Sequence, residues 1–145
     1  MNAYVDTSAW VKKYVREPGT ERLLKIVKRC KAVATSSIAY AEVYAAFSRL
    51  SRERSLTRRE FSSLAHGFER DWRALTIVEV SEEVLSRIPA LVAKFPLRGF
   101  DAIHLSSALW LKSRVSSFET FLCSDEGLFG SARAVGLNAI DPESG

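Results

Sequence analysis

Four acidic residues stand in sequence settings where a carboxylate is costly. They occur in the segments A-Y-V-D-T-S (Asp6), A-Y-A-E-V-Y (Glu42), G-F-D-A-I-H (Asp101) and L-C-S-D-E-G (Asp125). Each lies beside core-like sequence, where a charge removed from water needs an opposite charge to offset it. If the four converge, a hard divalent cation such as Mg²⁺ or Mn²⁺ is the ion that an all-oxygen ligand set prefers. The pattern therefore predicts one site in which Asp6, Glu42, Asp101 and Asp125 are both metal ligands and catalytic residues.

The segments that position these acids alternate between strand and helix patterns. Asp6 closes a strand over 3–6 and Asp125 follows a strand over 120–123, whereas Glu42 and Asp101 lie near the start of helices. Further strands are expected over 32–35, 75–80 and 138–141, and helices over 7–15, 20–30, 38–54, 57–72, 81–96, 100–113 and 125–135. This alternation favours an α/β fold with a parallel sheet covered on both faces. Ligands of such sheets bind beyond the carboxyl ends of the strands, where the acids are expected.

Length and composition are those of an ordinary globular domain. The 145 residues, 47% apolar and 26% charged, predict a single domain over 1–145 with one sizeable core. The sequence shows neither a membrane-spanning run nor a signal peptide, so we expect a cytoplasmic protein with Cys30 and Cys123 as reduced, buried thiols. A net charge of +4 permits nucleic-acid binding without requiring it.

Four segments, in this order, resemble the motifs of PIN domains: V-D-T-S-A-W-V, A-E-V, L-R-G-F-D-A-I-H-L-S-S-A-L and S-D-E-G-L-F-G-S-A-R-A-V-G-L. The likeness runs from about Asn2 to Pro142, and the chain length resembles that of VapC-type toxins of prokaryotic toxin–antitoxin pairs. The resemblance implies a three-layer α/β/α domain with a mostly parallel sheet, acting as a Mg²⁺- or Mn²⁺-dependent endoribonuclease. It also implies a homodimer that a cognate antitoxin inhibits, and it assigns metal binding to the same four acids.

One position departs from the family pattern. Many relatives carry Thr two residues before the last acid, where this chain has Cys123. The departure puts a secondary polar contact in question and leaves Asp125 itself in place.

Other polar residues near the acids fit either a structural or a functional role. Thr7 and Ser8 fit a helix cap, or a hydroxyl that reaches a metal-bound water, and Ser124 is a second such candidate. His104, three residues after Asp101, fits a general base or a hydrogen-bonded core histidine. The core reading is favoured because a metal-activated water does not need an imidazole base.

Basic residues supply candidates for RNA contacts. Lys12, Lys13 and Arg98 lie close to the acids in sequence, and Arg49 and Arg52 belong to the basic run R-L-S-R-E-R. Lysine and arginine at such positions would neutralise phosphates of the RNA backbone. The alternative for the basic run is a solvated helix end.

Competing functions remain open at this point. A haloacid-dehalogenase-type phosphatase would need a second Asp where Ser8 stands, and a receiver domain would need its acceptor Asp near 79–81, which reads Glu-Val-Ser. The sequence does not separate a toxin from a PIN nuclease that processes RNA. A PIN domain that binds RNA or a protein without cleaving is the serious rival, and the retention of all four acids argues against it. The number of metal ions, one or two, is also left open.

Overall fold

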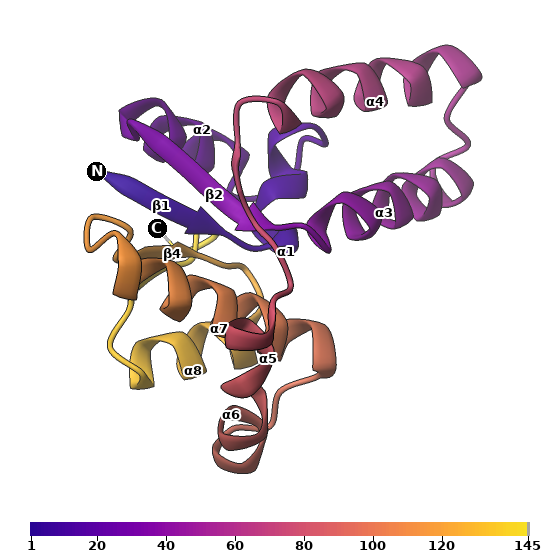
Figure 1. Ribbon diagram of the computed structural model, residues 1–145. Helices are drawn as coiled ribbons and strands as arrows, with labels where there is room; N and C mark the ends of the chain where they lie inside the picture. Colours follow the sequence, from indigo (N-terminus) through magenta and orange to yellow (C-terminus); the bar gives the residue numbers. More distant parts are fainter. Residues whose placement is uncertain (145) are drawn as a thin grey trace.

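A parallel sheet forms the centre of the molecule. The computed structural model describes residues 1–144, and within them five strands pair in the order β3-β2-β1-β4-β5 (Figure 1). The strands are β1 (Asn2–Val5), β2 (Ala32–Ser36), β3 (Thr76–Val78), β4 (Thr120–Leu122) and β5 (Asn138–Ile140). Every pairing between neighbouring strands of this sheet is parallel. All the carboxyl ends therefore lie along one edge, as the strand and helix pattern predicted.

Helices cover both faces of the sheet. One face carries α1 (Thr7–Trp10), the 3₁₀ turn η1 (Val11–Lys13), α2 (Thr20–Arg29), α3 (Ala39–Glu53) and α4 (Arg58–Trp72). The other carries α5 (Glu82–Ser86), α6 (Ile88–Lys94), α7 (Gly99–Arg114) and α8 (Glu126–Ala134). Successive strand residues point to opposite faces, so Ala3 and Val5 pack under the first layer and Tyr4 under the second. The expected three-layer α/β/α architecture is confirmed.

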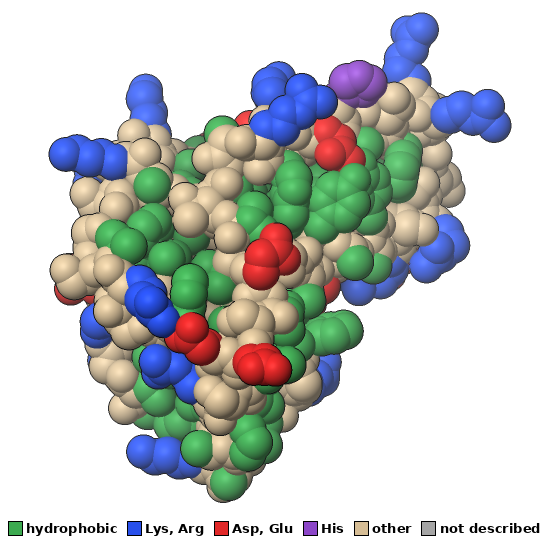
Figure 2. Space-filling view, viewed as in Figure 1, with side chains coloured by type: hydrophobic (Ala, Val, Ile, Leu, Met, Phe, Trp, Pro, Cys, Tyr) green, Lys and Arg blue, Asp and Glu red, His purple; other side chains and the backbone are tan. Residues whose placement is uncertain are grey.

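Helices α3 and α4 form a hairpin that projects from the sheet (Figure 1). A capping box starts α4: the Thr57 hydroxyl accepts from the Glu60 amide at 3.0 Å, and the Glu60 carboxylate accepts from the Thr57 amide at 2.9 Å. Figure 2 shows apolar side chains gathered over this hairpin. Phe68 is fully buried there, and Tyr40 is 39% exposed.

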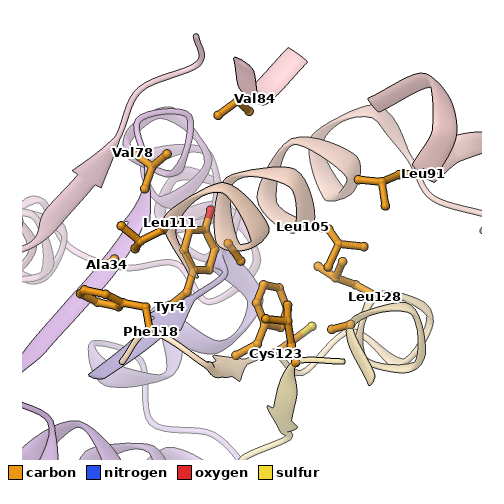
Figure 3. Packing of buried hydrophobic residues seen from close by; sticks show 14 residues of the cluster. Tyr4, Ala34, Val78, Val84, Leu91, Leu105, Leu111, Phe118, Cys123 and Leu128 are labelled. Carbon is orange, nitrogen blue, oxygen red and sulfur yellow. The ribbon is translucent and has the colours of Figure 1, made fainter. Parts of the chain in front are cut away.

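The core on the α7 side is built around β1 and β4 (Figure 3). The rings of Tyr4 and Phe121 stack with centroids 5.5 Å apart, and Leu105 of α7 is fully buried above them. Helix α7 packs against the sheet and against other helices, so it buries apolar side chains around most of its circumference. Each buried Leu or Phe stabilises the fold by about 1.5–3 kcal/mol. This packing fixes the helix that carries Asp101 and His104.

Two predicted elements differ in detail. The helix expected over 81–96 is two helices, α5 and α6, with Pro89 in the first turn of α6. Proline lacks an amide donor and fits a helix start better than a helix interior. The helix expected over 7–15 is one short turn of α-helix followed by the 3₁₀ turn.

Both cysteines are free thiols, but only Cys123 is buried, because Cys30 is partly exposed. Within residues 1–144, no helix has the length and hydropathy needed to cross a membrane.

Candidate functional site

The four acids predicted from the sequence line one pocket. Its volume is about 570 Å³, and it lies where β1 and β4 end and where α3 and α7 begin. The parallel sheet delivers Asp6 and Asp125, and the first turns of α3 and α7 deliver Glu42 and Asp101. Residues as far apart in sequence as 6 and 125 thus share one cavity because every strand ends at the same edge.

Asp6 is the most deeply placed acid, with an exposed fraction of 3%. It caps α1, since its Oδ1 accepts from the Ala9 amide at 3.1 Å. The Ser8 hydroxyl lies 2.8 and 2.9 Å from its two carboxylate oxygens and donates to them. Burial raises the pKa of Asp6, although the nearby His104 and these hydrogen bonds act in the opposite direction. Asp6 is therefore a helix cap that also lines the pocket.

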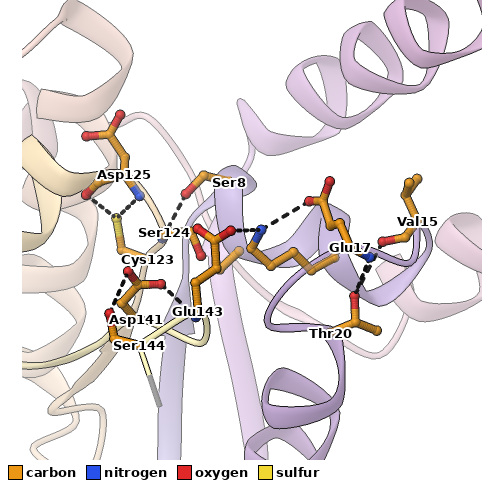
Figure 4. A network of polar contacts seen from close by, with 12 residues as sticks. Ser8, Val15, Glu17, Thr20, Cys123, Ser124, Asp125, Asp141, Glu143 and Ser144 are labelled. Atoms are coloured by element: carbon orange, nitrogen blue, oxygen red, sulfur yellow. Dashed lines mark hydrogen bonds and ion pairs between the residues drawn. The ribbon is translucent and has the colours of Figure 1, made fainter. Parts of the chain in front are cut away.

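Ser8 also joins the ends of two strands. Its hydroxyl accepts from the Ser124 amide at 3.0 Å, which ties the loop after β4 to the turn after β1 (Figure 4). The Ser124 hydroxyl is buried and has no hydrogen-bond partner within the described residues. Ser8 therefore holds Asp6 and its surroundings in place, while the secondary role predicted for Ser124 remains a prediction.

Asp125 caps α8, with its Oδ1 accepting from the Leu128 amide at 2.9 Å. The Asp125 amide lies 3.3 Å from Cys123 Sγ (Figure 4), and Cys123 Sγ lies 3.6 Å from Asp6 Oδ2. Burial raises the pKa of the Cys123 thiol, so it keeps its proton and donates toward Asp6. The Cys123 thiol thus makes a polar contact with Asp6 from the position where many relatives carry Thr.

Glu42 is held by two donors. Its Oε1 accepts from the Thr7 hydroxyl at 2.8 Å and lies 2.7 Å from His104 Nε2. On the other side of the ring, His104 Nδ1 lies 2.8 Å from the Tyr4 hydroxyl. Burial alone would raise the pKa of Glu42, but the hydrogen bond and charge of His104, with Thr7, lower it overall. The prediction of a hydrogen-bonded core histidine is confirmed, because His104 is 1% exposed.

Burial raises the pKa of the Tyr4 hydroxyl well above its ordinary value. Tyr4 therefore keeps its proton and pairs with His104 Nδ1, while the Glu42 carboxylate, which can only accept, takes the Nε2–H of the ring. This chain of hydrogen bonds orients the ring and presents Glu42 as a carboxylate.

The pKa of Asp101 shows that the charges of the acids repel one another. This pKa is raised, first by burial and then by the charge of Asp125, with a smaller contribution from Glu42. Carboxylates that repel across a cavity are the setting in which a divalent cation lowers the free energy. No three His, Cys, Asp or Glu side chains among residues 1–144 are arranged to chelate one ion directly. Mg²⁺ keeps several waters and takes one or two carboxylates directly, so the donor set fits an ion held partly through water.

The basic candidates separate into two groups. Arg49 and Arg98 line the pocket with the acids. Arg52 does not line it, and its guanidinium donates to the Ser48 hydroxyl at 2.9 Å.

The two lysines also lie outside the pocket lining. Lys12 is 5% exposed and pairs with Glu17 at 3.1 Å and Glu143 at 3.5 Å. Lys13 pairs with Asp71 at 2.7 Å and lies over the Trp10 ring. The burial of Lys12 between two carboxylates argues against the RNA contact predicted for it, while the contact predicted for Lys13 stays a prediction.

Tyr4 and Phe100 are among the residues that sequence reasoning missed at this site. Tyr4 looked like an ordinary strand residue, and only its polar tip in an otherwise apolar strand signals a buried hydrogen bond. Phe100, beside Asp101, lines the pocket and is 60% exposed. An apolar residue in an apolar helix gives no sequence signal of that exposure.

A comparison with protein-family models identifies the family of this chain. The PIN domain model matches residues 3–121. The chain belongs to the PIN domain family. The family resemblance seen in the sequence motifs is thereby confirmed, and the matched range contains Asp6, Glu42 and Asp101.

Named relatives and solved structures agree with a PIN assignment. Ribonuclease VapC45 of Mycobacterium tuberculosis is 36% identical over 106 residues, covering 73% of this chain and 74% of that protein. Ribonuclease VapC46 of the same species is 31% identical over 139 residues, covering 96% of each chain.

Among solved structures, VapBC2 from Rickettsia felis, bound to a DNA fragment from its promoter, aligns over 97% of this chain and 98% of that chain, with a TM-score of 0.66 at 15% identity. FitAcB from Neisseria gonorrhoeae aligns over 98% and 99%, with a TM-score of 0.68 at 16% identity. At these identities the structures establish the PIN fold.

Proposed function

We propose that this PIN domain is a Mg²⁺- or Mn²⁺-dependent endoribonuclease that hydrolyses RNA phosphodiester bonds. The observation that carries the proposal is the convergence of Asp6, Glu42, Asp101 and Asp125 on one pocket. Two named relatives more than 30% identical to this chain are ribonucleases, which supports RNA as the substrate.

The residues have separate roles in this proposal. Asp6, Glu42, Asp101 and Asp125 hold the metal, directly or through water. A divalent ion bound there supplies a water of lowered pKa and offsets charge that develops on the phosphate. Thr7 and His104 keep one Glu42 oxygen fixed, so Glu42 presents its other oxygen to the pocket. Arg49 and Arg98 neutralise phosphates of the RNA strand at the pocket wall.

Cleavage assays with and without metal test the proposal. The purified protein should cut RNA with Mg²⁺ or Mn²⁺ and stop when EDTA is added. Asp101→Asn, prepared in parallel, controls for a contaminating nuclease, because a contaminant is insensitive to that substitution. Full activity in EDTA contradicts the metal mechanism.

We further propose that the chain is the toxin of a VapBC-type pair, with a homodimeric state and a cognate antitoxin as partner. Support comes from relatives named VapC and from structural neighbours described as toxin–antitoxin complexes, including one from Klebsiella pneumoniae. A PIN nuclease that processes RNA without an antitoxin is the second candidate, and the same four acids serve it equally well.

A further inference from the structure

Phe100 exposes a large apolar ring to water, which is unfavourable for a phenylalanine side chain. It lies in the first turn of α7, next to Asp101, and 60% of its surface is open to solvent. The other large apolar residues that are exposed in the described part of the chain are Met1, Leu24, Tyr40, Leu85, Val92 and Val115. Phe100 is the most exposed of this group and the one member that lines the acid pocket. The exposed ring of Phe100 is therefore available to contact a ligand in this pocket.

The residues around Phe100 indicate which kind of ligand its ring can contact. Arg49 and Arg98 line the same pocket as the four acids and attract phosphate. A partner that combines negative phosphates with flat aromatic faces is a nucleic-acid strand. Phenylalanine has no hydrogen-bonding group, so it can contribute stacking on a base face and no reading of base edges.

We propose that Phe100 is a stacking platform for an unpaired base of the RNA substrate. This inference rests on the proposed ribonuclease function and assigns Phe100 to a base of that substrate, which has to be unpaired for its face to reach the ring. Bases inside a duplex already stack on their neighbours, so their faces are closed to the ring. Phe100 and Asp101 are neighbours in the first turn of α7 and both line the pocket, so a base on the ring belongs to a nucleotide at the acid site.

Kinetics on paired and unpaired RNA test the platform. Phe100→Leu keeps an apolar side chain and removes the ring, and it should raise KM for a single-stranded oligonucleotide about tenfold with little change in kcat. On a blunt duplex of the same sequence its kcat/KM should match that of the wild type. Phe100→Tyr keeps the ring and should restore the wild-type KM. Leu85→Ala, which alters an exposed apolar residue of α5 away from the pocket, is the matched control.

A binding measurement separates this inference from the proposed function. Single-stranded RNA carrying 2-aminopurine is titrated, with Mg²⁺ present, into Asp101→Asn and into Asp101→Asn combined with Phe100→Leu. Stacking quenches 2-aminopurine fluorescence, so the first protein should quench it and the second should not. If the wild type cleaves no RNA but this difference is present, the nuclease proposal fails and the platform stands.

Other outcomes overturn the platform. Wild-type cleavage with no effect of Phe100→Leu on KM, or with equal losses on single-stranded and duplex RNA, removes the stacking role. Equal losses in Phe100→Leu and Phe100→Tyr show that the ring does not decide binding. A quench that is the same with and without the ring, together with a changed sedimentation coefficient for Phe100→Leu, assigns the ring to a contact between copies of the chain.

Discussion

His104 Nε2 lies 2.7 Å from Glu42 Oε1, so a buried imidazole on α7 orients an acid on α3. The opposite ring nitrogen lies 2.8 Å from the hydroxyl of Tyr4 on β1. Three elements that are distant in sequence are thus joined by two hydrogen bonds. The arrangement gives His104 a positioning role, with its donor directed at Glu42 instead of at the open pocket.

The first prediction is that His104→Gln keeps substantial ribonuclease activity, within about tenfold of the wild type. Glutamine retains a donor that can reach Glu42, and an activated water in a metal site does not require imidazole. Steady-state cleavage in Mn²⁺ measures the activity, and circular dichroism confirms the fold. Tyr4→Phe is the matched variant, since it removes only the hydroxyl that orients the ring. A loss in His104→Gln as deep as that of Asp101→Asn gives His104 a direct catalytic role.

The second prediction concerns the acids themselves. Asp6→Asn and Asp101→Asn remove charge at nearly constant volume, and both should lower turnover by orders of magnitude by weakening metal binding. The Asn side chain keeps an oxygen that can accept from the Ala9 amide, so the α1 cap survives in Asp6→Asn. Titration with Mn²⁺, followed by the loss of the free-ion electron paramagnetic resonance signal, measures the affinity. Normal cleavage by both variants leaves Asp6 and Asp101 as structural residues.

The third prediction is a pH dependence of stability in metal-free protein. Burial and the Asp125 charge raise the pKa of Asp101 above its ordinary value of 3.8. An acid with a higher pKa in the folded state destabilises the fold once ionised. Stability is therefore lost as the pH rises from about 4 through the folded pKa of Asp101.

Asp101→Asn removes this contribution. In EDTA at pH 7 its Tm should exceed that of the wild type, and the two values should converge as the pH falls toward about 4. Thermal denaturation across this pH range provides the measurement, and excess Mg²⁺ should stabilise the wild type more than the variant. If the difference in Tm between the wild type and Asp101→Asn does not change with pH, the charge of Asp101 does not destabilise the folded protein.

The fourth prediction separates two neighbouring arginines. Arg49 lines the acid pocket and Arg52, three residues later on α3, does not. Arg49→Gln should raise the Kd for single-stranded RNA and reduce the salt dependence of log K by about 0.7, the change expected for one lost phosphate contact. Arg52→Gln should change neither quantity. Equal effects of both substitutions would indicate a diffuse electrostatic attraction.

Lys12→Met provides a contrasting case. Because Lys12 is buried against Glu17 and Glu143, its loss should lower the free energy of unfolding by about 1–2 kcal/mol. RNA affinity of the folded fraction should be unchanged. Urea denaturation and a binding titration on the same sample distinguish the two effects.

The fifth prediction concerns partners. Of the apolar residues on the α3–α4 hairpin, Phe47, Leu50 and Phe68 are buried, while Tyr40 is exposed and Trp72 is partly exposed. Much of the apolar surface of the hairpin is therefore covered, although apolar side chains still gather there (Figure 2). We expect a dimer in sedimentation at micromolar concentration, and inhibition by an Arg-containing segment encoded beside this gene. A strict monomer without a neighbouring small gene favours the RNA-processing nuclease.

Several features of this protein follow from the sequence by itself. The capping box of Thr57 and Glu60 was predictable because it depends on residues three apart. The positions of Asp6 and Asp125 at the ends of strands were predictable because short apolar runs and helix caps are local signals. The order of strands and helices then predicted a parallel sheet, and a parallel sheet places strand ends together.

Tertiary structure decided the direction in which each side chain points. Lys12 and Arg49 are equivalent in sequence as basic residues near an acid, but one turns into the protein and the other lines the pocket. The contact between Tyr4 and His104 joins residues 100 positions apart, and no local pattern encodes it. The exposure of Phe100 likewise depends on what packs around α7. Local sequence sets which backbone conformation a segment adopts, whereas burial and side-chain partners arise only when distant segments pack together.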